Sequence, residues 1–309
     1  MLSDFMRYAL YSRLSYYDDI TQMDLNLVTA QSHCVKPVKY LNNMDGQGWI
    51  FEDVVNLIDS IEEYDERDVL INNCNNSELI IALRGTDSIF DAVHNLTFVP
   101  VDYKNCGKVH MGYLNYYKTI RHDIQEAIDS YLNNDYLVLA NGANGTNKTN
   151  KTNKTNGTNK TVKINGTNTA NKANGTNTAN GTNKAVTFIG HSLGGSSATL
   201  GAFETSMNKD VFVRCVSFGA PPIGNSAFCE HFKNQVPMSY RFVNDKDIVP
   251  KMPFHKHVHG CIHLNKPKSL IVPKPKLWAN MSSCISNHSV ESYIYHLRRS
   301  TDMLPCNIK

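Results

Sequence analysis

A serine flanked by glycines is the feature of this sequence that most directly suggests chemistry. The pentapeptide Gly190-His191-Ser192-Leu193-Gly194 fits the pattern G-x-S-x-G, in which a nucleophilic serine lies on a sharp turn between a strand and a helix. The apolar run AVTFIG precedes the serine, and small residues typical of a tightly packed helix follow it. Gly190 and Gly194 are expected because a side chain at either position would clash where strand and helix approach. A simple packing turn of small residues is the alternative reading.

A serine hydroxyl is a poor nucleophile unless a histidine takes its proton and a carboxylate orients that histidine. In folds with this motif the chain order is serine, acid, histidine, so both partners should follow Ser192. Asp245 and Asp247 come directly after the predicted strand SYRFVN, and both are candidates for the acid. The candidate bases are the histidines of the C-terminal region: His255, His257, His259, His263, His288 and His296.

Three of these histidines alternate with other residues in the run HKHVHGCIH, which begins at His255. Strict alternation is typical of a strand and would place His255, His257 and His259 on one face. No carboxylate and no CxxC pair accompanies them, so we expect a solvated sheet edge rather than a metal site. We therefore expect neither a metal nor another cofactor.

The elements that must position these residues alternate between strands and helices. Apolar runs predict strands over 77–85, 185–190, 211–219 and 239–244, and helical spacing of apolar residues predicts helices over 111–132 and 193–207. Such alternation indicates an α/β fold with a mostly parallel central sheet flanked by helices, and with its ligand site at the carboxyl ends of the strands.

Composition excludes several classes of protein. The chain has 309 residues, 41% of them hydrophobic, and a formal net charge of only +3, so it can bury a large core and is not expected to bind nucleic acid. No apolar stretch reaches the roughly 18 residues that a transmembrane helix needs. The first residues predict an amphipathic helix instead of a secretory signal, with a buried face formed by Phe5, Tyr8, Ala9 and Leu14.

The segment 141–184 interrupts this pattern, because it consists almost wholly of Asn, Thr, Lys, Gly and Ala. Such a composition cannot offset the entropy of ordering, so we expect a disordered insertion within one domain that spans 1–309. The segment is dense in N-x-T sequons, and both glycosylation and simple expansion of a repeat would explain it.

Several segments, taken in order, resemble the fungal-type (class 3) lipases. They are ALRGTDSIFDAVHNLTFVPVDY, KVHMGYLNYY, VTFIGHSLGGSSATL, SFGAPPIGNSAF, YRFVNDKDIVPKMP and NHSVESY. The resemblance implies an α/β-hydrolase fold with Ser192 as nucleophile, Asp247 as acid and His288 as base. It also implies that Thr86 and the backbone N–H of Leu193 form the oxyanion hole.

The same resemblance implies a lid between Thr86 and Thr97. Apolar residues at helical spacing there include Ile89, Val93 and Leu96, and Phe90 adds bulk nearby. A stripe of this kind covers the serine in water and turns outward on lipid, or it packs permanently against the core.

The eight cysteines include no CxxC pair. The resemblance implies a disulfide between Cys34 and Cys306, and Cys261 and Cys284 are a second candidate pair. Because no secretory signal is visible, two interpretations stay open: a secreted protein whose start is truncated, and a soluble intracellular protein.

We therefore expect a serine-dependent carboxylic ester hydrolase that acts on lipid esters at a lipid–water interface, with a triacylglycerol lipase as the first hypothesis. A phospholipase or a feruloyl-type esterase is the alternative within this class. A non-catalytic lipid-binding or interaction protein on a lipase fold is the alternative outside it.

Overall fold

The computed structural model describes nine stretches of the chain: 2–28, 33–43, 46–55, 77–86, 99–133, 184–244, 246–252, 256–264 and 286–299. Within them, a seven-stranded sheet has the strand order β1-β2-β3-β6-β7-β8-β9. Its strands are β1 (His33–Asn43), β2 (Gly46–Val55), β3 (Ser77–Leu83), β6 (Ala185–His191), β7 (Phe212–Phe218), β8 (Met238–Asn244) and β9 (Cys261–Leu264). β3 and β6 to β9 are parallel, whereas β1 and β2 extend the sheet in antiparallel fashion.

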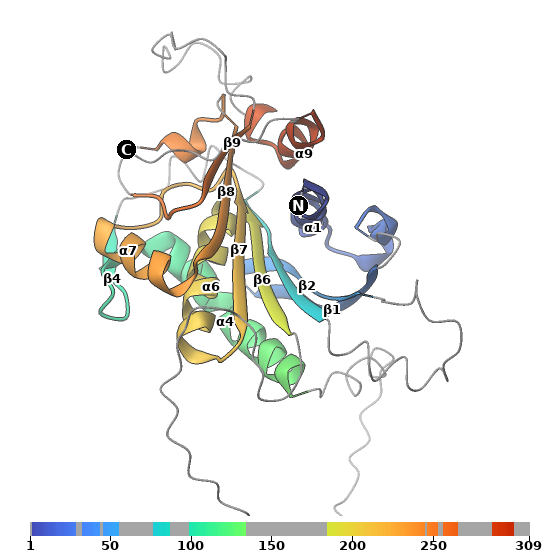
Figure 1. Ribbon diagram of the computed structural model, residues 1–309, viewed down its shortest axis with the longest axis horizontal. Coiled ribbons are helices and arrows are strands. Elements are labelled where there is room, and N and C mark those ends of the chain that lie inside the picture. Colours follow the sequence, from blue (N-terminus) through green and yellow to red (C-terminus); the bar gives the residue numbers. More distant parts are fainter. Residues whose placement is uncertain are drawn as a thin grey trace, which may run out of the picture.

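Helices cover both faces of this sheet (Figure 1). On one face lie α4 (Met111–Leu132), α6 (Leu193–Asn208) and α7 (Ser226–Gln235), and on the other lie α1 (Leu2–Leu14) and α9 (Val290–Arg299). A small hairpin of β4 (Pro100–Asp102) and β5 (Lys108–His110) lies outside the main sheet. The 3-10 turns are η1 (Ile20–Gln22), η2 (Leu25–Leu27) and η4 (Val249–Lys251).

Alternating side chains of the central strands fill two separate cores. On β3, Leu79 and Ile81 pack with α4 and α6, whereas Ile80 and Ala82 face α1 and α9. A strand that is buried on both faces is apolar throughout, which explains why a continuous apolar run was sufficient to predict it. The predicted α/β fold with a mostly parallel sheet is therefore confirmed.

The predicted first helix is also confirmed, because Phe5, Tyr8, Ala9 and Leu14 are all buried. Across the described ranges, no helix combines the length and the apolar character that crossing a membrane requires.

The strand predicted for His255, His257 and His259 is wrong. β9 begins only at Cys261, after Gly260, whose φ of 80° a residue in a regular strand would not adopt. The Nε2 atoms of His257 and His259 instead donate to the carbonyls of Pro250 and Pro237, at 2.6 Å and 3.1 Å. These two side chains stabilise separate turns, and His255 lies outside the described residues.

The insertion 141–184 returns to the fold beside the end of α4. Residues 134–183 lie outside the described ranges, but Lys184 donates from Nζ to the carbonyls of Tyr131 and Leu132, at 2.5 Å and 3.3 Å. These carbonyls belong to the last turn of α4, where a cation also interacts favourably with the helix dipole. From Lys184, β6 leads over about 20 Å to the opposite edge of the sheet.

We predict that replacing 141–183 with a short Gly-Ser linker, while keeping Lys184, does not lower the melting temperature. Loop-closure entropy changes only logarithmically with loop length, so the substitution changes stability by about 1–2 kcal/mol in favour of the shorter loop. Adding Lys184→Met to the shortened protein should lower the melting temperature by about 2–4 °C, since two carbonyls lose a charged donor. Differential scanning calorimetry of the three proteins checks both statements. A shortened protein that melts well below the parent would contradict this placement of the insertion.

Candidate active site

Ser192 lies on the turn between β6 and α6, in a conformation that few serines adopt. Its φ of 56° and ψ of −130° fall outside the favoured regions, and its backbone N–H donates to the carbonyl of Phe218 at 2.9 Å. A serine before a helix usually accepts a hydrogen bond from the first turn, but the Ser192 side chain makes no such bond. The strained turn therefore directs Oγ away from its own helix.

The glycines on either side allow this turn because backbone segments meet there. A Cβ atom on Gly190 would lie 2.3 Å from the carbonyl carbon of Gly194, and one on Gly194 would lie 2.3 Å from the carbonyl oxygen of Leu83. Both distances are far below van der Waals contact, so any larger residue would separate α6 from β6 or from β3.

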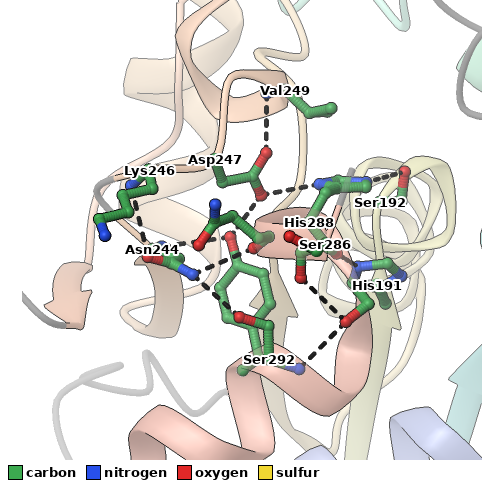
Figure 2. A network of polar contacts seen from close by, with 12 residues as sticks. His191, Ser192, Asn244, Lys246, Asp247, Val249, Ser286, His288 and Ser292 are labelled. Atoms are coloured by element: carbon green, nitrogen blue, oxygen red, sulfur yellow. Dashed lines mark hydrogen bonds and ion pairs between the residues drawn. The ribbon is translucent and has the colours of Figure 1, made fainter. Parts of the chain in front are cut away.

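Ser192, His288 and Asp247 form one chain of hydrogen bonds (Figure 2). His288 Nε2 lies 2.8 Å from Ser192 Oγ, and His288 Nδ1 lies 2.7 Å from Asp247 Oδ2. Because a carboxylate can only accept, Nδ1 carries the proton, and Nε2 of the neutral ring accepts from the serine hydroxyl. All three side chains are buried. The arrangement can remove the proton of the serine hydroxyl and stabilise the imidazolium that results.

Two further donors hold the carboxylate of Asp247. The backbone N–H of Val249 donates to Oδ1 at 2.9 Å, and the Tyr293 hydroxyl of α9 donates to Oδ2 at 2.6 Å. Burial, and then the nearby carboxylate, raise the pKa of Tyr293 well above its usual value of 10, so the hydroxyl stays protonated. No chemical motif in the sequence singles out Tyr293, and only its position as the last residue of the segment NHSVESY points to it.

Thr86 lies just beyond the end of β3, next to the serine turn. Gly85 lies so close that an added Cβ would be 2.9 Å from Cβ of Ser192. Arg84 holds this segment, since its Nη1 is 2.8 Å from Asp18 Oδ1 and its carbonyl accepts from the Tyr116 hydroxyl at 2.6 Å. Leu193 is the first residue of α6, where backbone N–H groups have no acceptor within the helix.

Several predicted residues lie outside the described part of the chain. These are the lid residues Ile89, Phe90, Val93 and Leu96, the alternative acid Asp245, and the cysteines Cys284 and Cys306. Cys261 is buried, and Cys34 is in β1 with no described side chain. Because their predicted partners lie outside the described residues, the disulfides Cys34–Cys306 and Cys261–Cys284 stay predictions. Among the described cysteines, Cys106, Cys215 and Cys229 are free thiols, and burial raises the pKa of Cys215 and Cys229 to about 12.

Within the described ranges, one group of side chains has the spacing of a metal site: His122, Asp123 and Glu126 on α4. Lys39 Nζ occupies it, with 2.8 Å to Asp123 and 2.9 Å to Glu126. Because the ammonium group already forms an ion pair with each carboxylate, we assign no metal to this group.

The family of the protein follows from comparison with known sequences. A profile of the class 3 lipases matches residues 80–139 and 157–257, so the chain belongs to the class 3 lipase family. Phospholipase A(1) DAD1 of Arabidopsis thaliana is 38% identical over 71 residues, which are 22% of this chain and 16% of that protein. A lipase of Rhizomucor miehei is 25% identical over 196 residues, which are 62% of this chain and 41% of that protein. The chain thus matches less than half the length of these curated relatives.

Solved structures support the same fold. The triacylglyceride lipase of Rhizomucor miehei superposes with a TM-score of 0.52 at 20% identity, covering 85% of this chain and 80% of that one. Lipase II of Rhizopus niveus superposes with a TM-score of 0.54 at 17% identity, covering 89% and 87%. The expected fold of the fungal lipases, the α/β-hydrolase fold, is therefore confirmed.

We predict that acid destabilises this protein partly through His257, which donates to Pro250 in the loop that carries Asp247. Burial, and then Arg241, lower the pKa of His257 from 6.5 to about 4. The unfolded chain therefore binds more protons between these values, and the stability that neutral His257 contributes above pH 6.5 is lost progressively as the pH falls from 6.5 to about 4. The loss amounts to about 3 kcal/mol.

Urea unfolding between about pH 4.5 and 7.5 should show this loss in the wild type and a smaller loss in His257→Gln, which keeps an N–H donor but does not titrate. The pKa of His191 is also lowered, and His191 contributes equally to both proteins. Parallel stability curves for the two proteins would rule out His257 as the source.

Proposed function

We propose that this protein is a serine-dependent carboxylic ester hydrolase. The observation that carries the proposal is the buried chain of hydrogen bonds from Ser192 through His288 to Asp247, at the end of a strained turn between strand and helix. Membership of the class 3 lipase family supports the same reaction class.

In the proposed reaction, Ser192 Oγ attacks the ester carbonyl while His288 Nε2 takes the hydroxyl proton. Asp247 orients the ring and stabilises the imidazolium, which then gives its proton to the leaving alcohol. An acyl-enzyme remains. Water attacks it with His288 again as the base, and the fatty acid leaves as Ser192 recovers its proton.

Thr86 and Leu193 are the proposed oxyanion-hole residues. The N–H of Leu193 is at the N-terminus of α6, where the helix dipole favours negative charge. The hydrogen bonds to Arg84 hold the segment before Thr86 against the serine turn. Donors of this kind each contribute about 3–4 kcal/mol to the stabilisation of the tetrahedral intermediate.

Acylglycerols are the proposed substrates, with the lid between Thr86 and Thr97 contacting the lipid surface. Val99 and Met111 lie where this segment rejoins the described fold, and both are exposed apolar residues linked by a backbone hydrogen bond of 2.9 Å. The similarity to a triacylglyceride lipase supports this substrate class. A phospholipase A1 activity is the second candidate, because a phospholipase A1 is 38% identical over the matched segment.

A single domain interrupted by the insertion 141–184 remains our proposal for the organisation of the chain.

We predict that the purified protein hydrolyses p-nitrophenyl butyrate and that Ser192→Ala abolishes this activity. Asp247→Asn should lower kcat by about 10³–10⁴-fold, because the imidazole loses its orienting acceptor, while Asp245→Asn should act weakly. The matched pair of substitutions separates loss of charge in the loop from loss of the hydrogen bond to His288. A wild-type protein that hydrolyses no ester, or unchanged hydrolysis by Ser192→Ala, would refute the proposed enzymatic function. The non-catalytic lipid-binding hypothesis would then remain.

We further predict that the rate on tributyrin rises as the substrate passes from dissolved monomers to an emulsion. Replacing Ile89 and Val93 with serine should weaken that rise but leave hydrolysis of the soluble ester within about twofold, since only contact with lipid is changed. A pH-stat assay with tributyrin, and with phosphatidylcholine vesicles as the second substrate, measures both. A rate on tributyrin that saturates smoothly through the solubility limit would favour a soluble-ester esterase, such as a feruloyl-type enzyme. Faster release of fatty acid from the phosphatidylcholine vesicles than from tributyrin would favour the phospholipase.

A further inference from the structure

His191, the residue before the serine, bonds to the backbone of His288. Its Nε2 lies 2.5 Å from the carbonyl oxygen of His288, and its Nδ1 lies 2.6 Å from the Tyr16 hydroxyl. A carbonyl oxygen only accepts, so Nε2 carries the proton and Nδ1 accepts from the tyrosine. Figure 2 shows His191 beside the strand end with its ring close to His288.

His191 remains neutral while it makes this bond. Burial, and then repulsion from His288, lower the pKa of His191 well below 6.5. The two ring centroids are 4.7 Å apart, so a second positive charge would oppose the imidazolium that forms on His288 during the proposed reaction. A neutral N–H donor avoids this repulsion.

Asn244, the last residue of β8, bonds to the neighbouring carbonyl. Its Nδ2 donates to the carbonyl oxygen of Asn287 and to Ser292 Oγ, both at 3.1 Å, and its Oδ1 accepts from the backbone N–H of Lys246 at 3.3 Å. The side chain is fully buried, so water does not compete for these bonds.

The two carbonyls belong to the two peptide units that flank Cα of His288. Because a peptide unit is planar, holding each carbonyl fixes the orientation of its plane, and together the two planes determine φ and ψ of His288. The ends of β6 and β8 thus each supply one hydrogen bond to the ring of His288 and one to the backbone beside it. Ser192 and His191 do so at the end of β6, and Asp247 and Asn244 do so at the end of β8.

We propose that His191 and Asn244 are positioning residues that hold the two carbonyls flanking His288 and thereby keep its imidazole aligned between Ser192 and Asp247. This proposal rests on the proposed hydrolase function. A displacement of a reacting group by about 1 Å costs about 100-fold in rate, so the hydrogen bonds to the backbone should affect turnover more than substrate binding.

The test compares two substitutions of His191 that separate its N–H donor from its aromatic ring. In His191→Gln the side-chain amide places an N–H near the position of Nε2, whereas His191→Phe keeps a ring but has no donor. With p-nitrophenyl butyrate, we expect His191→Phe to lower kcat about 10- to 100-fold with KM within about threefold, and His191→Gln to recover most of the loss. Asn244→Asp, which keeps the acceptor for Lys246 but loses the donor, should lower kcat by a similar factor.

Thr187→Val serves as the control for general loosening of the fold. Thr187 is a buried polar residue of β6 that bonds to Glu78, at the end of the sheet opposite Ser192. We expect it to lower the melting temperature and to leave kcat within about twofold, with all assays run well below the lowest melting temperature. Equal activity of the Phe and Gln variants, or a Gln variant weaker than Phe, would overturn the proposal, because ring packing and not the donor would then be decisive.

A measurement without turnover separates this proposal from the hydrolase function. In ¹⁵N NMR spectra of histidine-labelled Ser192→Ala protein, His191 should be neutral at pH 7 and protonated on Nε2. The downfield proton of His288 Nδ1, bonded to Asp247, should persist in His191→Gln and weaken in His191→Phe. A protein that hydrolyses no ester but shows these signals would refute the function alone. A His191 that carries its proton on Nδ1 and none on Nε2 would refute the positioning role.

Discussion

The candidate site depends on the hydrogen bonds of one imidazole ring. Of the three hydrogen-bonded residues Ser192, His288 and Asp247, His288 is the one that does not lie in a turn directly after a strand of the sheet. β6 and β8 are parallel and flank β7, so their carboxyl ends meet at one edge and bring Ser192 and Asp247 within reach of a single histidine. His288 comes from a helical turn before α9. Its bonds of 2.8 Å to Ser192 and 2.7 Å to Asp247 therefore join that turn to the two strands.

The distribution of charge follows from this arrangement. At the carboxyl edge of the strands, the carboxylate of Asp247 is surrounded by neutral donors, namely Tyr293, the N–H of Val249 and His288. Arg7 and Arg214 pair with Asp53 and Glu78 at the opposite end of the sheet, and Arg84, at the end of β3, pairs with Asp18. Pairing is needed there because a buried charge without a partner costs several kcal/mol. The separation leaves the charge formed on His288 during turnover with Asp247 as its counter-ion.

Those parts of the fold whose strands are buried on both faces could be predicted from the sequence. β3, β6, β7 and β8 appear as apolar runs, and α4 has an apolar face at helical spacing. β1 and β2 were not predicted, since they mix residues such as Lys36, Lys39 and Asp53 with apolar ones, and an antiparallel pair at a sheet edge has no such run. The alternation that suggested a strand at His257 and His259 failed because each of these side chains bonds to the carbonyl of a different proline.

For the site, the sequence by itself determined the nucleophile motif, since the steric requirement for Gly190 and Gly194 is local to one turn. Spacing alone left two acids and six histidines open, and a family resemblance selected among them. Tertiary structure decided which of them meet, because contact between His288 and Ser192, 96 residues apart, depends on how distant strands are ordered in the sheet. Tertiary structure also decided the roles of His191, Asn244 and Tyr293. Their side chains act on a backbone or a carboxylate that is remote in sequence, and no local pattern records such contacts.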